Sequence, residues 1–306
     1  MTRSRPAPAP RRGAPPGSAP RSARHLRPPS ARSPARARSR PPRSAAAAHA
    51  GLTSVPVPVD EYGIDVRALE ATGARAVLVT PAHQWPTGVV MAAERRLALI
   101  DWAERNNTFV IEDDYDAEFR YDREPVGALQ GLAADRVISI GTVSKSLAPA
   151  LRIGWVLRPP ALTAGIAANK HLADRGSPTL DQFALARLVE SGRYDRHLRR
   201  MRGTYAARRA ALVTALAEQA PGARLTGLAA GFHAVLHLDT STGTSTGSGT
   251  GEEALIAAAL TRRVGLYGMS VHHASPTTSP RLVLGFGNVN ERDITAGIAA
   301  VGDLLP

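Results

Sequence analysis

The sequence predicts an α/β protein whose mainly parallel sheet carries helices on both faces, followed by a smaller α+β carboxy-terminal subdomain. Apolar runs of buried-strand length alternate with segments of helical periodicity between residues 74 and 157. This alternation is typical of parallel βαβ units with right-handed connections. After Pro159 and Pro160 the pattern changes to long helices and a few separate strands, which indicates a second subdomain.

In the first part of the chain, each element is expected from its local pattern. Leu97, Ile100 and Trp102 supply the apolar face of one helix. The expected elements are an extended segment at 55–60, a short helix at 65–70, a strand at 74–80, a loop at 81–88, a helix at 92–105, and strands at 108–113, 136–141 and 152–157.

The second part is expected to be rich in helix before a small sheet forms. Residues 161–218 are largely helical in pattern, with one long helix from about Tyr194 to Leu216. The expected elements that follow are a strand at 230–239, a helix near 252–263, a strand at 281–287 and a last helix at 291–305. Residues 240–251 are low in complexity and contain no Lys, so they are predicted to be a flexible surface insertion and not a phosphate-binding loop.

The first fifty residues differ in composition from the rest. They contain twelve Arg, no Lys, Asp or Glu, and only Leu26 as a large apolar side chain. Such a segment cannot bury a core, so residues 1–50 are predicted to be a disordered tail. The tail is expected to bind polyanions without sequence preference, if it is more than a compositional accident of an Arg-biased coding sequence.

Composition also excludes several classes of protein. The formal net charge of +12 equals the charge of the tail, so residues 51–306 are neutral and sequence-specific DNA binding by this chain is not expected. No run of 18 apolar residues could form a membrane span. The chain has no Cys, which excludes disulfides and thiolate chemistry, and a cytoplasmic location is expected.

Lysine usage points to one candidate catalytic residue. The chain has 38 basic residues, of which only Lys145 and Lys170 are lysines. An amine can lose its proton and attack a carbonyl, whereas a guanidinium cannot. Lys145 directly follows the strand at 136–141, at the edge of the sheet where α/β proteins bind ligands. Lys170 lies on an exposed helix and is expected to be a solvated surface residue.

Groups suited to an anionic cofactor surround Lys145. Thr142 and Ser144 offer hydroxyls, and Arg152 offers a bidentate guanidinium that suits a phosphate monoester. The acidic segment 111–122 begins at the end of the neighbouring strand. Taken alone, it could be a Mg²⁺ site, a solvated acidic turn, or a carboxylate and a phenol that contact a ring nitrogen and a ring oxygen.

Three ordered motifs reveal a resemblance to a known family. The runs are VTPAHQWPTGVVMAAERRLALIDWA, IEDDYDAEFRYD and GTVSKSLAPALRIGW. They resemble the aminotransferase-type domain of MocR/GabR-family proteins, within the fold-type I superfamily of aminotransferases that depend on pyridoxal 5'-phosphate (PLP). The resemblance covers about residues 55–306. It implies a partial PLP-binding large domain at 51–190, followed by a long helix and a small subdomain at 191–306.

The resemblance also implies a role for each motif residue. Lys145 would form the aldimine with PLP, and Asp113 would pair with the pyridine nitrogen while Tyr115 bonds the phenolic oxygen. Thr142, Ser144 and Arg152 would hold the phosphate. In the loop 81–88, Trp85 stands where the superfamily usually has Asn, so His83 or Gln84 is expected to substitute for that contact. Arg281 is the candidate for binding the substrate carboxylate.

The implied function is amino-group transfer from an amino acid to a 2-oxo acid, in a homodimer. Two alternatives remain open: a PLP-binding effector domain of a MocR-type regulator, and a non-functional fragment. Residues 1–54 contain no pattern for the winged helix-turn-helix or the glycine-rich start of the large domain that such proteins have. The chain is therefore expected to be truncated at its amino end.

Overall fold

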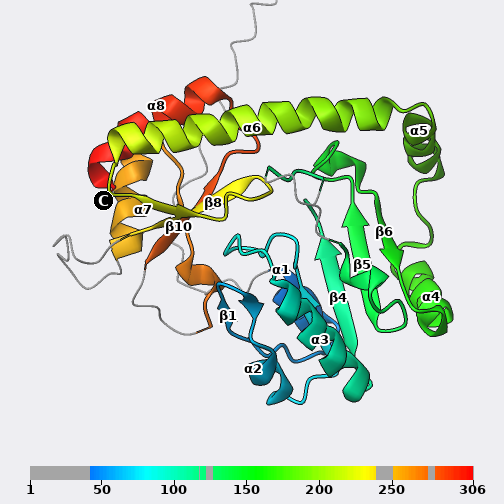
Figure 1. Ribbon diagram of the computed structural model, residues 1–306. Helices are drawn as coiled ribbons and strands as arrows, with labels where there is room; N and C mark the ends of the chain where they lie inside the picture. The colour runs from blue at the N-terminus through cyan, green and yellow to red at the C-terminus, as the bar shows by residue number, and fades with distance from the viewer. Residues whose placement is uncertain (1–41, 117, 122–126, 239–250, 275–279, 306) are drawn as a thin grey trace, which may run out of the picture. The chain divides into compact units, whose positions relative to one another are not determined.

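The computed structural model describes residues 42–116, 118–121, 127–238, 251–274 and 280–305. Within these residues the chain forms a two-stranded sheet of β1 (Val59–Asp60) and β2 (Gly63–Ile64) and two four-stranded sheets. The four-stranded sheets have the strand orders β3-β4-β5-β6 and β7-β8-β10-β9 (Figure 1). The expected α/β architecture, with a smaller second sheet, is therefore present.

The first four-stranded sheet is mixed. β3 (Ala76–Val79), β4 (Phe109–Asp114) and β5 (Val137–Thr142) are parallel to one another, as expected. β6 (Gly154–Leu157) runs antiparallel to β5. The link between them holds only a turn and the short 3-10 helix Pro149–Leu151, and a parallel crossover needs a longer connection. The sequence pattern identified this strand but not its direction.

Helix α3 (Ala93–Arg105) covers one face of this sheet, beside the short helix α2 (Val66–Glu70). The α2 helix begins at Asp65, whose carboxylate accepts hydrogen bonds from the first-turn amides of Arg67 and Ala68. The core beneath α3 joins apolar side chains of the helix and the strands: Val77, Val79, Leu99, Ile100, Trp102, Ala103, Val110 and Val137. This core holds the carboxyl ends of β4 and β5 in place.

The face of the sheet opposite α3 carries apolar side chains that are partly exposed. Leu78 and Val156 lie on that face and are 43% and 40% exposed. Alternation along the strands places Ile111 and Ile140 on the same face.

Trp102 is the largest side chain in the core beneath α3 and is only 2% exposed. We expect Trp102→Ala to lower the free energy of unfolding by about 3–5 kcal/mol, because it removes a large buried side chain and leaves a cavity. Leu97→Ala is the matched control on the same helix. Leu97 was expected in the apolar face but is 62% exposed, so its loss should cost less than about 1 kcal/mol. Urea unfolding of both variants measures the difference, and equal losses would contradict this packing.

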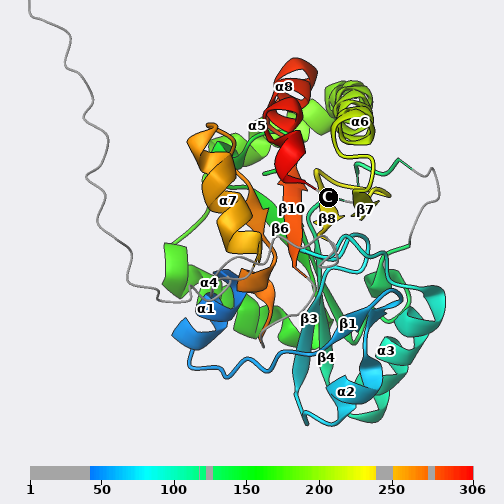
Figure 2. The same ribbon diagram turned by 90° about the vertical axis from the view of Figure 1, so that its left-hand side faces the viewer.

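The second sheet is antiparallel and packs against two helices. Its strands are β7 (Arg224–Thr226), β8 (His233–His237), β9 (Tyr267–Gly268) and β10 (Arg281–Gly285). Apolar side chains of β8 and β10 form one core with those of α6 (Arg193–Gln219) and α8 (Glu291–Val301), which lie beside each other in Figures 1 and 2. The helix α7 (Gly251–Thr261) completes this part.

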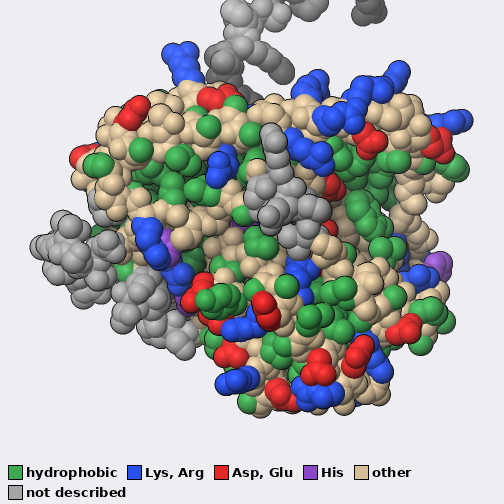
Figure 3. Space-filling view, in the orientation of Figure 1, with side chains coloured by type: hydrophobic (Ala, Val, Ile, Leu, Met, Phe, Trp, Pro, Cys, Tyr) green, Lys and Arg blue, Asp and Glu red, His purple; other side chains and the backbone are tan. Residues whose placement is uncertain are grey.

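Three helices follow β6, as expected: α4 (Thr163–Asp174), α5 (Thr179–Glu190) and the long α6. Neither α4 nor α5 buries a residue. Figure 3 shows Lys and Arg side chains gathered along α6, which contains seven arginines. Although the net charge of residues 51–306 is zero, positively charged side chains are concentrated on α6.

The amino-terminal tail prediction needs one correction. Residues 42–49 form helix α1 (Pro42–His49), although residues 1–50 were expected to be disordered. The sequence of this helix contains four consecutive alanines, the residue with the highest helix propensity. Residues 1–41 and 240–250, where the remaining tail and the insertion were expected, lie outside the described residues.

Candidate functional site

The carboxyl ends of β4 and β5 bring the predicted site residues together. Asp113 on β4 lies opposite Ile140 on β5, two residues before Thr142. Because side chains alternate along a strand, Asp113 and Thr142 share the face opposite α3. Lys145 is exposed in the turn directly after β5. A carboxylate, a hydroxyl and an amine therefore project from one edge of the sheet.

The turn after β5 has a fixed polar arrangement. Thr142 Oγ1 lies 2.9 Å from Ser144 Oγ and 3.1 Å from the carbonyl oxygen of Ile153, and it accepts a hydrogen bond from the Ser144 amide at 3.1 Å. Arg152 has a left-handed backbone with φ 51°, which is unfavourable for a residue with a Cβ. Such backbone strain tends to occur at functional sites.

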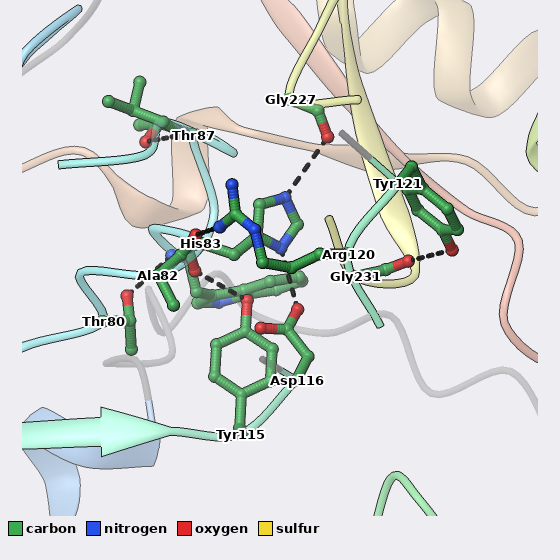
Figure 4. A network of polar contacts seen from close by, with 12 residues as sticks. Thr80, Ala82, His83, Thr87, Tyr115, Asp116, Arg120, Tyr121, Gly227 and Gly231 are labelled. Atoms are coloured by element: carbon green, nitrogen blue, oxygen red, sulfur yellow. Dashed lines mark hydrogen bonds and ion pairs between the residues drawn. The ribbon is translucent and has the colours of Figure 1, made fainter. Parts of the chain in front are cut away.

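Tyr115 lies next to the loop 81–88. Its hydroxyl donates a hydrogen bond to the carbonyl oxygen of His83 at 3.0 Å (Figure 4). Within the loop, the Trp85 amide donates to Thr80 Oγ1 at 3.0 Å, and the Trp85–Pro86 peptide bond is cis. The loop is thus held by Thr80, which directly precedes it, and by Tyr115, which directly follows β4.

The side chains of the loop residues His83 and Gln84 form hydrogen bonds within the protein. His83 is buried, and its ring Nδ1 lies 2.8 Å from Asp116 Oδ2 while its Nε2 lies 3.2 Å from the carbonyl oxygen of Gly227. Gln84 Nε2 donates to the Trp85 carbonyl oxygen at 3.4 Å. Both ring nitrogens of His83 face protein acceptors, so a cofactor contact from its ring would require the loss of one of them.

A buried aromatic group lies beside this loop. The ring of His233, which is 4% exposed, lies 4.4 Å from the His83 ring and 4.7 Å from the Trp85 ring between centroids. Burial lowers the pKa of His233 to about 3, and the nearby charges of His83 and Lys145 act in the same direction. His233 is therefore neutral at physiological pH.

The lowered pKa of His233 predicts a pH dependence of stability. Between pH 6.5 and about 3 the unfolded state binds a proton at His233 that the folded state does not, so the free energy of unfolding falls as the pH falls. We expect His233→Gln to flatten this dependence by up to about 4 kcal/mol over that window. Urea unfolding at a series of pH values measures it. His171→Gln, on the exposed helix α4, should leave the slope unchanged; equal slopes in the parent and in His233→Gln would contradict the prediction.

Arg281 begins β10 and has hydrogen-bonding capacity to spare. Its Nε is buried and has no hydrogen-bond partner among the described residues, and its Nη2 lies 3.5 Å from His273 Nε2. An unpartnered buried guanidinium nitrogen is costly unless a ligand satisfies it, and a carboxylate is the group that suits it best. This arrangement fits the substrate-carboxylate role expected for Arg281.

The carboxylates of the acidic segment 111–122 contact different groups. Glu112 points to the α3 face, where it accepts hydrogen bonds from the amides of Leu129 at 2.8 Å and Gln130 at 3.1 Å. Asp116 pairs with His83.

No group of three or more His, Asp or Glu side chains in the described part of the chain could hold a metal ion. Nor is any helix there long and apolar enough to cross a membrane.

Comparisons with known proteins agree with this geometry. The family described as aminotransferase class I and II matches residues 42–301. The uncharacterized HTH-type transcriptional regulator YhdI of Bacillus subtilis (strain 168) is 36% identical over 245 residues, which cover 79% of this chain and 50% of that protein. The probable rhizopine catabolism regulatory protein MocR of Rhizobium meliloti is 41% identical over 165 residues, 54% of this chain and 34% of that protein. The chain thus spans about half the length of YhdI, and its match to MocR covers about a third of that protein.

A solved structure shares the fold. The kynurenine aminotransferase of Pyrococcus horikoshii, in complex with PMP, KYN as substrates and KYA as products, superposes with a TM-score of 0.73 at 28% identity. The superposition covers 82% of this chain and 63% of that chain.

Proposed function

Because the chain belongs to the family of class I and II aminotransferases, we propose that it binds PLP at Lys145 and transfers an amino group from an amino acid to a 2-oxo acid. The observation that carries this proposal is the edge formed by β4 and β5. There Asp113 and Thr142 share one face, and Lys145 follows in the next turn. The similar kynurenine aminotransferase was solved with PMP, the aminated form of PLP.

The residues present fit each part of the cofactor. The carboxylate of Asp113 suits a protonated ring nitrogen, and the hydroxyl of Tyr115 suits a ring oxygen. The adjacent hydroxyls of Thr142 and Ser144, with the strained Arg152, suit a phosphate. His83 and Gln84 lie in the loop beside Tyr115, and we assign them to support of that loop.

When bound, PLP supplies an electron sink for the carbanion formed at the substrate Cα. The side chains of the chain supply the other parts of the reaction. Arg281 binds the substrate carboxylate and orients the Cα–H bond. Lys145 would accept the Cα proton as general base and return it during transfer. The carboxylate of Asp113 would hold a proton on the ring nitrogen and so strengthen the electron sink.

The remaining features of the proposal concern organisation. We assign the large domain to residues 51–190 and the small subdomain, with its long helix, to residues 191–306. The protein acts as a cytoplasmic homodimer on an amino acid and a 2-oxo acid. The exposed sheet face with Leu78 and Val156 agrees with a further polypeptide layer, from this chain or from a partner.

A second candidate function is the sensing of an amino acid by a regulator, and the similarity to YhdI favours it. Both functions need PLP at Lys145, so turnover separates them. The PLP-loaded protein is mixed with each amino acid and a 2-oxo acid, and the new 2-oxo acid is quantified. Many equivalents of product per protein indicate an aminotransferase. A saturable change of the visible spectrum without product indicates a sensor, and no change with any amino acid would contradict both.

A further inference from the structure

A buried ion pair joins three segments that are far apart in the sequence. His83 comes from the loop after β3, Asp116 from the segment after β4, and Gly227 from the turn between β7 and β8 (Figure 4). The side chains of His83 and Asp116 are 0% and 1% exposed. The pair therefore lies where the first sheet's loops meet the second sheet.

Both nitrogens of the His83 ring have partners within the protein. Nδ1 faces the carboxylate of Asp116 and Nε2 faces the carbonyl oxygen of Gly227, and both of these groups accept hydrogen bonds. The contact with Asp116 is shielded from water, and a hydrogen bond in such surroundings is stronger than one in water.

Glycines allow the second sheet to approach this pair. A Cβ at Gly231 would lie 2.2 Å from Asp116 Oδ2 and 2.4 Å from His83 Nδ1, and Gly231 has a φ of +73°. Gly88 and Gly227 likewise meet backbone to backbone, where a Cβ at Gly88 would lie 2.4 Å from the Gly227 Cα. Side chains at these positions would separate the segments that the ion pair joins.

The same two segments hold the phenol of Tyr115. Its hydroxyl donates to the backbone carbonyl of His83, while the next residue, Asp116, binds the ring of His83. One residue of the loop is thus held at its backbone and at its side chain by two consecutive residues after β4. The position of the Tyr115 hydroxyl depends on the loop, and the loop depends on the ion pair.

We propose that His83 and Asp116 are positioning residues: their ion pair fixes the loop 81–88, sets the place of the Tyr115 hydroxyl at the ring oxygen of the cofactor, and links that place to the contact with residues 227–231. This inference rests on the proposed binding of PLP. It assigns a role in the site to Asp116 and Gly231, which contact neither Lys145 nor the phosphate-binding turn in any hydrogen bond described above.

A double-mutant cycle tests whether the pair acts through Tyr115. The readout is the pH midpoint at which the visible absorbance of bound PLP changes. A phenol that donates to the ring oxygen stabilises its anionic form, so Tyr115→Phe should raise the midpoint by about one pH unit. Asp116→Asn should raise it by a large part of that amount. The double variant should match Tyr115→Phe alone, and two shifts that simply add would overturn the proposal.

Two further variants test whether a shift of the midpoint comes from the pair itself or from a general loss of structure. Gly231→Ala keeps every polar group but inserts a methyl against the pair, and it should shift the midpoint as Asp116→Asn does. Asp101→Asn is the matched control: it removes a carboxylate that pairs with Arg105 on the exposed side of α3, and the midpoint should stay where it is in the parent. A midpoint unchanged in Gly231→Ala would count against the proposal.

The melting temperatures without PLP provide a second, independent test. If Tyr115 and the pair are coupled through the loop, the two substitutions overlap in effect. The double variant with Asp116→Asn and Tyr115→Phe should then lose less melting temperature than the two single variants lose in sum. Additive losses would overturn the inference even if PLP binds. If the parent shows no visible absorbance with PLP, the proposed function fails, and the melting temperatures alone decide the positioning role.

Discussion

Lys145→Ala is expected to abolish covalent capture of PLP. The ε-amine is the only group at the edge of β4 and β5 that can form a bond with the aldehyde, whereas the guanidinium of Arg152 cannot. The measurement incubates the protein with PLP, reduces the mixture with borohydride and determines the mass. The parent should gain one reduced PLP per chain and the variant should gain none at this position, because the amine that forms the bond is absent.

Lys170→Ala is the matched control for this experiment. Lys170 is exposed on α4, where its Nζ lies 2.5 Å from Asp174 Oδ2 and 2.6 Å from Ser177 Oγ. Its removal should leave the capture of PLP unchanged, because surface ion pairs of this kind contribute little. Equal capture by the parent and Lys145→Ala would show that Lys145 has been assigned wrongly.

Asp113→Asn is expected to slow amino-group transfer by about 10²–10³-fold while PLP remains bound. The amide cannot stabilise a positive charge on the ring nitrogen, and removal of one such preorganised electrostatic partner has effects of this size. The rate is measured in a single turnover, from the change in the visible spectrum after an amino acid is added to the PLP-loaded protein.

The neighbouring residue provides the control. Asp114 is the last residue of β4 and, by the alternation of side chains, lies on the α3 face of the sheet and not on the face of Asp113. Asp114→Asn should change the rate by less than about threefold, as expected for a residue that does not contact the cofactor. Similar losses in the two variants would contradict the assignment of the ring nitrogen to Asp113.

The parts of the fold that were predicted correctly are those with a local signal. The strand over 108–113, the helix over 92–105 and the long helix from Tyr194 to Leu216 correspond closely to β4, α3 and α6. The family, expected from three motifs, is confirmed by the match to class I and II aminotransferases. The direction of β6 was not predictable, because it depends on which elements pack together and not on periodicity.

The same division applies to the candidate site. Asp113, Thr142 and Lys145 could be predicted because each lies at or just after the end of a recognisable strand, and parallel strands bring their carboxyl ends together. The partners of His83 could not, because Asp116 is 33 residues and Gly227 is 144 residues away along the chain. The closest sequence signal was that Asp116 directly follows Tyr115. Contacts at such separations appear only once the two sheets are placed in contact.

The location of the trapped cofactor tests the central claim most directly. The PLP-loaded protein is reduced with borohydride and digested, and the modified peptide is identified by mass spectrometry. A single adduct on Lys145, at one equivalent per chain, is the result predicted by the site at the ends of β4 and β5. An adduct on Lys170 or on the chain's amino terminus, or no adduct on a folded protein, would contradict it.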